Sequence, residues 1–544
     1  MSSNVDVLVV GAGPTGLVAA LSLAKNGVHV RVIEKLPKHP MGQRGANILP
    51  RTLEVYHFLG VLADIKKAGT YKSDLKEWKD GKPVKTYSGM TGLDPTPSFP
   101  ERSVCLLGQD ATCGILREHL KSYGIEVELA TELVRLEQDE GSATASVVIH
   151  RAVKESEETI TVKYVVGADG ARGVVRKLLG LSFLGETRST INMITGDAEM
   201  YGVDQDYIHK FDGMPNGIVT LRPTDRSAKE NIYFYSAFGP KFDHNRALED
   251  HEYLRQFVYD TTKLPELKIG KIETIANYRP NIRVVNRFNK GRVFVAGGGQ
   301  GMNSSVMDAF NLGWKLALAS EGLANPELLD SYNAERLPVV KEMLERTTTL
   351  LNRAISSGDG QPSSGKKSEP PSPWSRPHEL NQLGVNYRWS PIVVDELNAK
   401  DQGKVEEPPA SAYIASGRLH AGDRAPDAPG LVDLKTGGVR RLFDIFGPDH
   451  HTVLVFTDGD AALALCPVAR FPAGLIRTIA IRSQSASPAE AVADVDILLQ
   501  DKEGHAHLAY PTPVAIIRPD GVVGALVDGT EGVKKYFADA TPGF

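Results

Sequence analysis

The segment Val5–Glu34, VDVLVVGAGPTGLVAALSLAKNGVHVRVIE, decides the fold because it holds a complete strand–turn–helix–strand pattern. Val7–Val10 is a short, mostly β-branched apolar run of the length of a buried parallel strand. Apolar residues at helical spacing predict a helix over Pro14–Lys25, and Val28–Ile33 is a second strand. The sequence therefore predicts an α/β fold built on a dinucleotide-binding βαβ unit of the Rossmann type.

The turn between the first strand and the helix carries a GxGxxG motif, Gly11-Ala12-Gly13-Pro14-Thr15-Gly16. Its first glycine permits the tight turn, its second lets a pyrophosphate approach the backbone, and its third permits close helix–strand packing. Glu34 follows at the spacing expected of a ribose-binding acid, and phosphates would lie at the positive end of the helix. The pattern predicts an adenine dinucleotide site. A glycine turn without a ligand remains the alternative, and the motif does not separate FAD from NAD.

Composition excludes several classes of protein. A chain of 544 residues is expected to hold two to four domains, and a net charge of −5 argues against a polyanionic partner such as nucleic acid. The first predicted strand begins so early that we expect no signal peptide, and no apolar run has membrane-spanning length. Three cysteines (Cys105, Cys113 and Cys466), without CxxC or metal-type spacing, suit a reducing compartment, so a cytoplasmic protein without a bound metal is expected.

Further charged residues follow the βαβ unit at positions where a nucleotide could be contacted. Arg44 and Arg51 lie where the chain leaving Glu34 could return to the phosphates, which the planar guanidinium suits. Surface arginines on a solvated loop are the alternative. The strand Thr159–Val166 leads into Ala168-Asp169-Gly170, which is followed by two arginines a turn apart, Arg172 and Arg176. This segment is a second candidate nucleotide contact, although Asp169 could instead be only a helix N-cap.

The remaining chain indicates an insertion and a second α/β unit. Glu126–Ala130 and Thr144–His150 are predicted to pair as strands, and residues 190–285 show mainly strands with few helix signals. Residues 356–377 are polar and rich in Pro, Ser and Gly, which predicts a flexible excursion. A new α/β pattern begins near Gly422 and includes a helix predicted over Pro488–Ala493.

Five segments match one family in the family's own order. They are GAGPTG with Glu34, PRTLEVYHFLGV, Gln109, VVGADGARGVVRKLLG, and GRVFVAG followed by GQGMNSSVMDAFNLGWKLAL. Together they resemble the single-component FAD-dependent aromatic hydroxylases (class A flavoprotein monooxygenases), most closely the phenol 2-monooxygenase-like branch. The resemblance spans roughly residues 5–350, and the C-terminal part looks like the thioredoxin-like domain of that branch.

The resemblance implies a division into domains. Residues 1–180 and 291–352 would form the FAD-binding domain, and residues 181–290 an inserted antiparallel substrate-binding sheet. Residues 353–421 would be a linker, and residues 422–544 the thioredoxin-like domain, which packs or supports a homodimer.

The resemblance also implies the reaction. NADPH (or NADH) would reduce FAD, O2 would add to form a flavin hydroperoxide, and one oxygen would pass to a phenolic or other aromatic small molecule. Aromatic catabolism or secondary metabolism is the expected setting. The alternatives are an FAD oxidoreductase without oxygen insertion, and a flavin-site-impaired homologue or splice variant with a structural or binding role.

Residue roles follow from the same resemblance. Glu34 would bind the adenosine ribose, Arg44 and Gln109 would lie near the pyrophosphate and ribityl chain, and Asp169 would serve both FAD and NADPH. Tyr278 matches a tyrosine that lies near substrate in the phenol branch and is the predicted catalytic residue, with simple packing in the sheet as the alternative. The helix starting at residues 301–303 would direct its amides at the flavin ring. The full predicted cofactor-binding set is Gly11, Gly13, Pro14, Thr15, Gly16, Glu34, Lys35, Arg44, Gln109, Asp169, Gly301, Met302 and Asn303.

Three departures from the family pattern affect these expectations. Gly297 runs directly into Gly298-Gly299-Gln300, so the family's Gly-Asp loop and its ribityl-binding aspartate are missing, which predicts weakened FAD binding. Ala46 stands where phenol hydroxylases carry a catalytic aspartate, which argues against phenolate activation by that route. The thioredoxin-like part has no CxxC, and Cys466 has no cysteine nearby, which argues against redox catalysis there.

Overall fold

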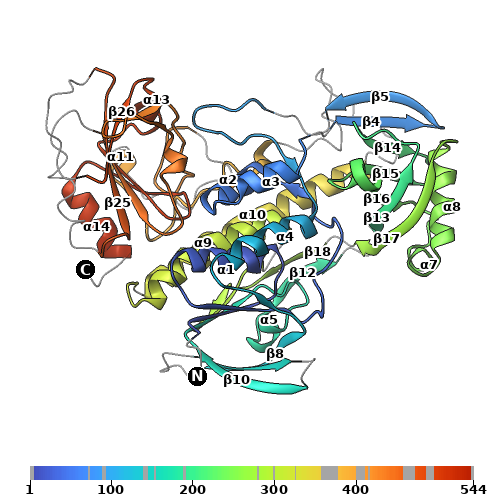
Figure 1. The fold of residues 1–544 in the computed structure, drawn as a ribbon, viewed down its shortest axis with the longest axis horizontal. Helices are drawn as coiled ribbons and strands as arrows, with labels where there is room; N and C mark the ends of the chain where they lie inside the picture. Colours follow the sequence, from blue (N-terminus) through green and yellow to red (C-terminus); the bar gives the residue numbers. More distant parts are fainter. Residues whose placement is uncertain are drawn as a thin grey trace.

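The computed structural model describes most of the chain, and three sheet-based units are visible in Figure 1. The described residues are 5–71, 74–88, 93–138, 145–151, 155–187, 192–278, 281–297, 301–324, 326–356, 378–399, 411–413, 417–456, 472–485 and 495–540. Among the described helices, none combines the length and the apolar character needed to cross a lipid bilayer.

A six-stranded sheet forms the centre of the first unit, in the order β19-β20-β11-β1-β2-β7. All neighbouring strands run parallel except β19 and β20. The predicted βαβ unit is confirmed, because helix α1 spans Pro14–Lys25 and connects two parallel neighbours. The strands are β1 (Val7–Val10), β2 (Val30–Ile33), β7 (Val127–Glu128), β11 (Tyr164–Gly167), β19 (Asn289–Lys290) and β20 (Val293–Val295).

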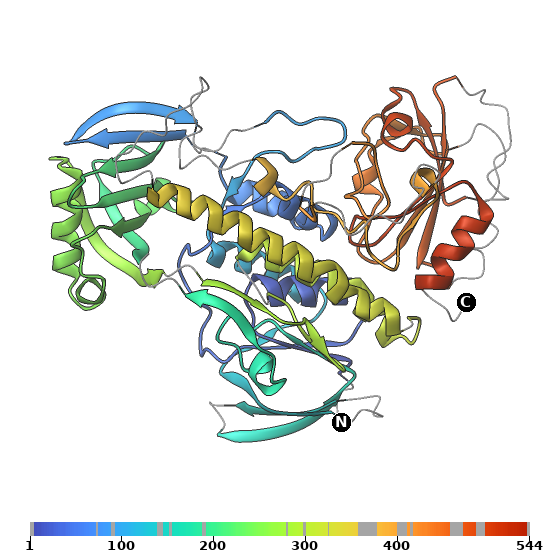
Figure 2. The ribbon, with the colours of Figure 1, turned by 180° about the vertical axis from the view of Figure 1, so that it is seen from behind.

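Helices cover one face of this sheet and a smaller sheet covers the other (Figure 1). Helix α1 packs closely against α9 (Met302–Ser320), where a Cβ on Gly313 would lie 2.3 Å from Ser22 Oγ, so only glycine permits this approach. Helix α10 (Pro326–Ser356) runs from beside the C-terminal unit toward the seven-stranded sheet (Figure 2). The other elements of this unit are β3 (Asn47–Ile48), α2 (Pro50–Phe58), α3 (Leu62–Ala68), β6 (Cys105–Leu106), α4 (Gln109–Lys121), β8 (Thr131–Gln138), β9 (Ala145–Arg151), β10 (Ser156–Val162), α5 (Val174–Leu178), β12 (Phe183–Thr187) and β18 (Asn281–Val285).

The predicted pairing of Glu126–Ala130 with Thr144–His150 is wrong. The first segment contributes β7, which extends the parallel sheet beside β2, whereas β9 pairs with β8 and β10 in an antiparallel sheet. Both segments are strands, but alternation alone does not specify the partner of a strand.

The inserted unit is a seven-stranded sheet in the order β17-β13-β16-β15-β14-β4-β5. It is antiparallel except between β14 and β4. Strands β4 and β5 come from the N-terminal part of the chain, outside the predicted range 181–290. The elements are β4 (Asp74–Lys79), β5 (Lys82–Ser88), β13 (Met193–Tyr201), β14 (Ile208–Asp212), β15 (Ile218–Pro223), α6 (Ser227–Glu230), β16 (Ile232–Phe238), α7 (His244–Glu249), α8 (His251–Thr262) and β17 (Lys268–Tyr278).

The expectation of few helix signals in this insertion missed α7 and α8, which cover one face of the sheet (Figure 1). Helix α8 begins after an N-cap, because the Asp250 side chain accepts a hydrogen bond from Tyr253 N at 3.0 Å. Leu254 and Val258 lie one turn apart on its buried face. The capping residue and the apolar spacing are both readable in the sequence.

The C-terminal unit contains an eight-stranded sheet in the order β21-β28-β27-β24-β25-β26-β22-β23. Strand β21 (Val394–Asp395) pairs with β28, so this unit begins before the predicted boundary at Gly422 and takes in part of the predicted linker. The expected excursion at 357–377, the helix at 488–493 and Cys466 lie outside the described residues. The remaining elements are η2 (His378–Asn381), α11 (Glu396–Ala399), β22 (Leu431–Asp433), β23 (Val439–Arg440), η3 (Leu442–Asp444), β24 (His451–Phe456), β25 (Ile476–Arg482), β26 (Ile497–Asp501), α13 (His505–Ala509), β27 (Val514–Ile517), β28 (Val523–Val527) and α14 (Thr530–Ala540).

A buried ionic cluster joins the first and C-terminal units. Glu335 of α10 accepts hydrogen bonds from Arg518 at 2.7 and 3.0 Å and from Lys315 of α9 at 2.8 Å, and Asp520 also pairs with Arg518. The Glu335, Arg518 and Lys315 side chains are fully buried. Burial by itself would raise the pKa of Glu335, but the charges of Arg518 and Lys315 outweigh it and hold that pKa well below its usual value.

Replacing Glu335 with Gln should lower the free energy of unfolding by about 3–5 kcal/mol, because Arg518 and Lys315 then lose a buried counter-charge. Urea denaturation at neutral pH measures this change. The matched control is Glu531→Gln, which breaks an exposed pair with Lys534 and should leave the stability nearly unchanged. Because the pKa of Glu335 is depressed, wild-type protein should retain this stabilisation from neutral pH down through mild acid and lose it only in strong acid. An unchanged urea midpoint for Glu335→Gln would contradict the assignment.

Candidate cofactor and active site

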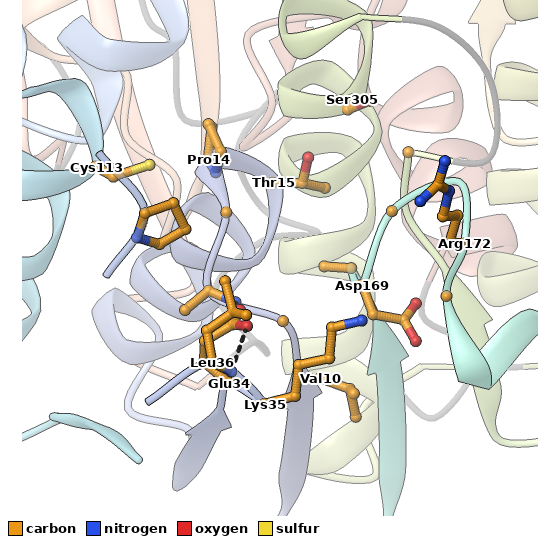
Figure 3. A pocket seen from close by; sticks show the side chains of 18 of the residues that line it. Val10, Pro14, Thr15, Glu34, Lys35, Leu36, Cys113, Asp169, Arg172 and Ser305 are labelled. Carbon is orange, nitrogen blue, oxygen red and sulfur yellow. Dashed lines mark hydrogen bonds between the residues drawn. The ribbon is translucent and has the colours of Figure 1, made fainter. Parts of the chain in front are cut away.

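A cavity of about 760 Å³ opens where β1, β2 and β11 end, at the carboxyl edge of the parallel sheet. Val10 and Gly11 from the end of β1, Glu34 from the end of β2 and Asp169 from the segment after β11 line it (Figure 3). Ligands of open α/β sheets bind at this edge, because the loops that follow parallel strands converge there.

The three motif glycines have different surroundings. A Cβ on Gly11 would lie 2.6 Å from Ala168 O, and a Cβ on Gly16 would lie 1.9 Å from Gly11 O, so both positions serve close backbone packing. Gly11 also has a φ of 102°, which favours glycine. A Cβ on Gly13 would meet nothing within 4 Å, and Gly13 lines the cavity. The space in front of Gly13 is therefore available to a ligand that approaches the backbone.

Helices α1 and α9 both begin at the cavity wall without a capping side chain. Helix α1 starts after Gly13 and α9 starts after Gly301, and neither N-cap makes a side-chain hydrogen bond to the helix. Pro14, Thr15 and Met302, from the first turns, also line the cavity. The first N–H groups of a helix have no partner within it and favour anions. Two such termini at one cavity suit a ligand that carries negative charge at two places.

Glu34 is held at the end of β2 beside the glycine turn. Its carboxylate accepts hydrogen bonds from Ala12 N at 3.0 Å and from Leu36 N at 3.1 Å, the latter shown dashed in Figure 3. Lys35 lines the cavity next to it. These contacts fix an acidic group at the position where a ribose hydroxyl would donate a hydrogen bond.

Asp169 lines the cavity beside the start of a helix. Its carboxylate accepts hydrogen bonds from Val174 N at 2.6 Å and Val175 N at 3.1 Å, at the start of α5. Burial raises the pKa of Asp169 despite these hydrogen bonds. The carboxylate thus accepts from the first turn of α5, although Gly173 and not Asp169 occupies the N-cap position, and the contact of Asp169 with a nucleotide stays a prediction.

Arg44 and Gln109 approach the cavity from two segments. Both residues line it, and Gln109 begins α4, where its backbone N–H donates to Gln43 O at 3.1 Å. Arg44 is exposed and has a φ of 42°, in the left-handed region that is uncommon for a residue with a side chain of this size.

Two predicted cofactor residues lie outside the cavity wall. Gly16 packs within the turn, as described above. The Asn303 side chain donates to Asn47 O at 2.8 Å and accepts from Leu49 N at 2.9 Å, so it joins α9 to the segment before α2. Asn303 thus positions the helix whose terminus faces the cavity.

Arg51 does not reach the cavity and is not a surface residue. It is buried, pairs with Glu54 and donates to Asp520 O at 3.0 Å in the turn between β27 and β28. Both sequence-based interpretations of Arg51 were therefore wrong. Its partner across the interface comes from a segment more than 460 positions away, which local sequence cannot reveal.

Tyr278 lies at the end of β17 and lines the cavity. Its side chain is 53% exposed, so it is not a packing residue of the sheet. Ala46, at the position of the family's aspartate, is buried, and its carbonyl accepts a hydrogen bond from Leu107 N at 2.9 Å. The shortened Gly298-Gly299-Gln300 segment lies outside the described residues.

Sequence reasoning missed two cations of the cavity wall, Arg117 on α4 and Lys177 on α5. They have no local signal because helix packing alone brings them to this wall. Arg172, one of the two arginines predicted beside the Asp-Gly motif, also lines the cavity, in the loop after Asp169 (Figure 3). These cations favour a polyanionic ligand such as a dinucleotide.

Comparisons with known proteins agree with this geometry. A family model described as an FAD binding domain matches residues 4–347. A flavin-dependent monooxygenase of Mycobacteroides abscessus is 32% identical over 553 residues, which cover 98% of this chain and 99% of that protein. A pentachlorophenol 4-monooxygenase of Sphingobium chlorophenolicum is 27% identical over 546 residues, covering 96% and 94% of the two chains.

Solved structures resemble the whole fold. The flavin-dependent monooxygenase PieE, in complex with FAD and substrate, superposes with a TM-score of 0.79 at 22% identity and covers 99% of this chain and 98% of that one. A ternary complex of aklavinone-11 hydroxylase with FAD and aklavinone gives a TM-score of 0.77 at 22% identity, with both chains fully covered.

Replacing Gly13 with Ala should weaken FAD binding at least about tenfold, because the new Cβ occupies the space that a pyrophosphate needs. Titration of FAD into apoprotein, followed by flavin fluorescence, measures this effect. The melting temperature should stay close to that of wild type, since Gly13 has an ordinary φ of −74° and no neighbour within 4 Å of the Cβ. In contrast, Gly16→Ala should destabilise the fold itself. Wild-type affinity in Gly13→Ala would show that the dinucleotide binds elsewhere.

Proposed function

This chain belongs to the FAD-binding-domain family of flavin-dependent aromatic monooxygenases, and on that premise we propose how its cavity serves the reaction. The protein is an FAD-dependent monooxygenase that uses NADPH as reductant and acts on an aromatic small molecule. The expected aromatic-hydroxylase family, its α/β fold and its cofactors are confirmed. The observation that supports the proposed roles is the meeting of two uncapped helix N-termini, Glu34 and Tyr278 at one cavity.

The residues present fit an FAD molecule. The N-terminus of α1, the open space at Gly13 and the Arg44 guanidinium would hold the pyrophosphate, and Glu34 would hold the adenosine ribose. The N-terminus of α9 at Gly301 and Met302 would face the flavin ring. There it would stabilise negative charge by about 0.3–2 kcal/mol. When bound, FAD supplies the activation of O2, which we propose as the oxygen donor.

The aromatic substrate would lie between the α9 terminus and the inserted sheet. Among the described residues of that sheet, Tyr278 is the one that lines the cavity. Its hydroxyl can donate or accept a hydrogen bond with a ring hydroxyl of the substrate, while Ala46 offers no ionisable group. We therefore assign Tyr278 as the residue that orients a phenolic substrate through a hydrogen bond to its ring hydroxyl.

The division into an FAD-binding domain, a substrate sheet and a C-terminal thioredoxin-like unit is part of the same proposal. The buried cluster around Glu335 supports a structural role for the C-terminal unit, because it fixes α9 and α10.

The reaction is tested with purified protein and a panel of phenols. Wild-type protein should show the visible spectrum of bound oxidised flavin. A phenolic substrate should stimulate NADPH oxidation and yield a product with one added oxygen. Peroxide formed in full stoichiometry with every phenol, without hydroxylated product, would contradict oxygen insertion. A colourless protein that remains colourless after FAD is added would contradict the site.

Replacing Tyr278 with Phe should reduce hydroxylated product per NADPH consumed by at least about tenfold, because the substrate loses the hydrogen bond that orients it. FAD affinity should not change. Product and peroxide are measured together in the same assay. Tyr201→Phe is the control, since Tyr201 is an exposed tyrosine at the opposite end from Tyr278 in the paired strands β13 and β17. Unaltered coupling in Tyr278→Phe would remove Tyr278 from the mechanism.

A further inference from the structure

The loop 42–44 connects the cofactor cavity to the inserted sheet. Gly42 N donates to Asp110 Oδ2 at 2.9 Å, and Gln43 N donates to Asp197 Oδ2 at 3.0 Å. Asp110 belongs to α4 at the cavity wall, whereas Asp197 belongs to β13 of the seven-stranded sheet. Two consecutive backbone amides are therefore held by carboxylates from two separate parts of the molecule.

The Gln43 side chain adds a second attachment to the inserted sheet. Its Nε2 donates to Asp225 Oδ1 at 2.8 Å, and its Oε1 accepts from Arg222 Nη2 at 3.4 Å, at the end of β15. Only 2% of Gln43 is exposed. The loop cannot move from the sheet without breaking these contacts.

The backbone has a positive φ on both sides of Gln43, and at Arg44 this conformation is strained. Gly42 has a φ of 105° and Arg44 a φ of 42°. A Cβ on Gly42 would lie 2.9 Å from Asp197 Oδ2, so the loop lies directly against that carboxylate. An arginine stays in the left-handed region only where the surrounding structure imposes it, and such residues cluster at functional sites. Arg44 is also the residue through which this loop presents a charge to the cavity.

Asp197 is an unusual residue for a sheet interior. It is 2% exposed, and its Oδ2 also accepts from Thr274 Oγ1 at 2.7 Å, while Oδ1 has no hydrogen-bond partner among the described residues. Burial raises the pKa of Asp197. A buried carboxyl group with one unsatisfied oxygen is unfavourable for stability. The hydrogen bond that Asp197 accepts from the Gln43 amide holds the loop 42–44 in place, which explains why a carboxylate is buried here.

We propose that Asp197 is a positioning residue for the cofactor: through the Gln43 amide it holds the strained loop that directs Arg44 at the FAD pyrophosphate. FAD affinity then depends on a side chain of the substrate sheet that does not line the cofactor cavity. This inference rests on the proposed function of the cavity as the FAD site.

A double-mutant cycle in the full-length protein tests the assignment, with FAD titrated into each apoprotein. Asp197→Ala and Arg44→Ala should each weaken FAD binding about tenfold or more. The double variant should bind no more weakly than Arg44→Ala, because Asp197 acts through Arg44. Asp197→Asn keeps an acceptor oxygen for the Gln43 amide and should restore affinity to within about threefold of wild type. Additive losses, or no rescue by Asn, would overturn the proposal.

A control and a cofactor-free measurement separate the possible failures. The control is Glu199→Ala, which removes the acid two residues after Asp197 on β13. The Glu199 carboxylate accepts a hydrogen bond from Lys271 N and does not line the cavity, so this change should leave FAD affinity unchanged. In apoprotein, Asp197→Ala should accelerate hydrogen exchange of the amides of residues 42–44. If wild type does not bind FAD, the proposed function fails. If wild type binds FAD, and the Asp197→Ala variant has the same FAD affinity and the same hydrogen-exchange rates at residues 42–44, only this inference fails.

Discussion

The carboxylate of Glu335, enclosed away from water and bound by Arg518 and Lys315, is the interaction on which the arrangement of the molecule depends. Lys315 lies on α9, the helix whose first residues line the cofactor cavity, so the cluster fixes that helix at a distance from the chemistry. Asp308 of the same helix binds Arg336 of α10 at 2.7 Å and accepts from Gly297 N at 3.1 Å. The C-terminal unit therefore helps to position α9, whose first residues line the cavity, although no described residue of that unit lines the cavity itself.

Much of the cofactor site could be predicted because its determinants are local in sequence. The strand, glycine turn, helix and acid of the first 34 residues each follow from nearby residue types, and α1 begins and ends at the predicted residues. Arg44 was a candidate from its position after Glu34, whereas Tyr278 and Gln109 required a family resemblance, since nothing in their immediate neighbours distinguishes a cavity residue from a surface one. All three line the cavity.

The failures have a shared physical origin in long-range packing. Arg51 was assigned to phosphate or to solvent, but its partners are residues of the β27–β28 turn. Strand β21 was placed in a linker because two residues carry no periodic signal. In each case the deciding contact comes from a part of the chain that a local pattern does not include. The helices α7 and α8 differ, because their caps and apolar spacing were present in the sequence and were outweighed by the surrounding strands.

The central parallel sheet is assembled from three distant stretches of chain, which contribute first β1 and β2, then β7 and β11, and finally β19 and β20. During synthesis on the ribosome, the nascent chain can form the first glycine turn early, but it cannot complete the cavity until α9 has emerged. The inserted sheet is translated in the interval, so it is available to fold before the sheet that surrounds its insertion point is complete. The cavity wall can therefore be complete only after residues 301–305 have been synthesised, later than every described strand of the inserted sheet.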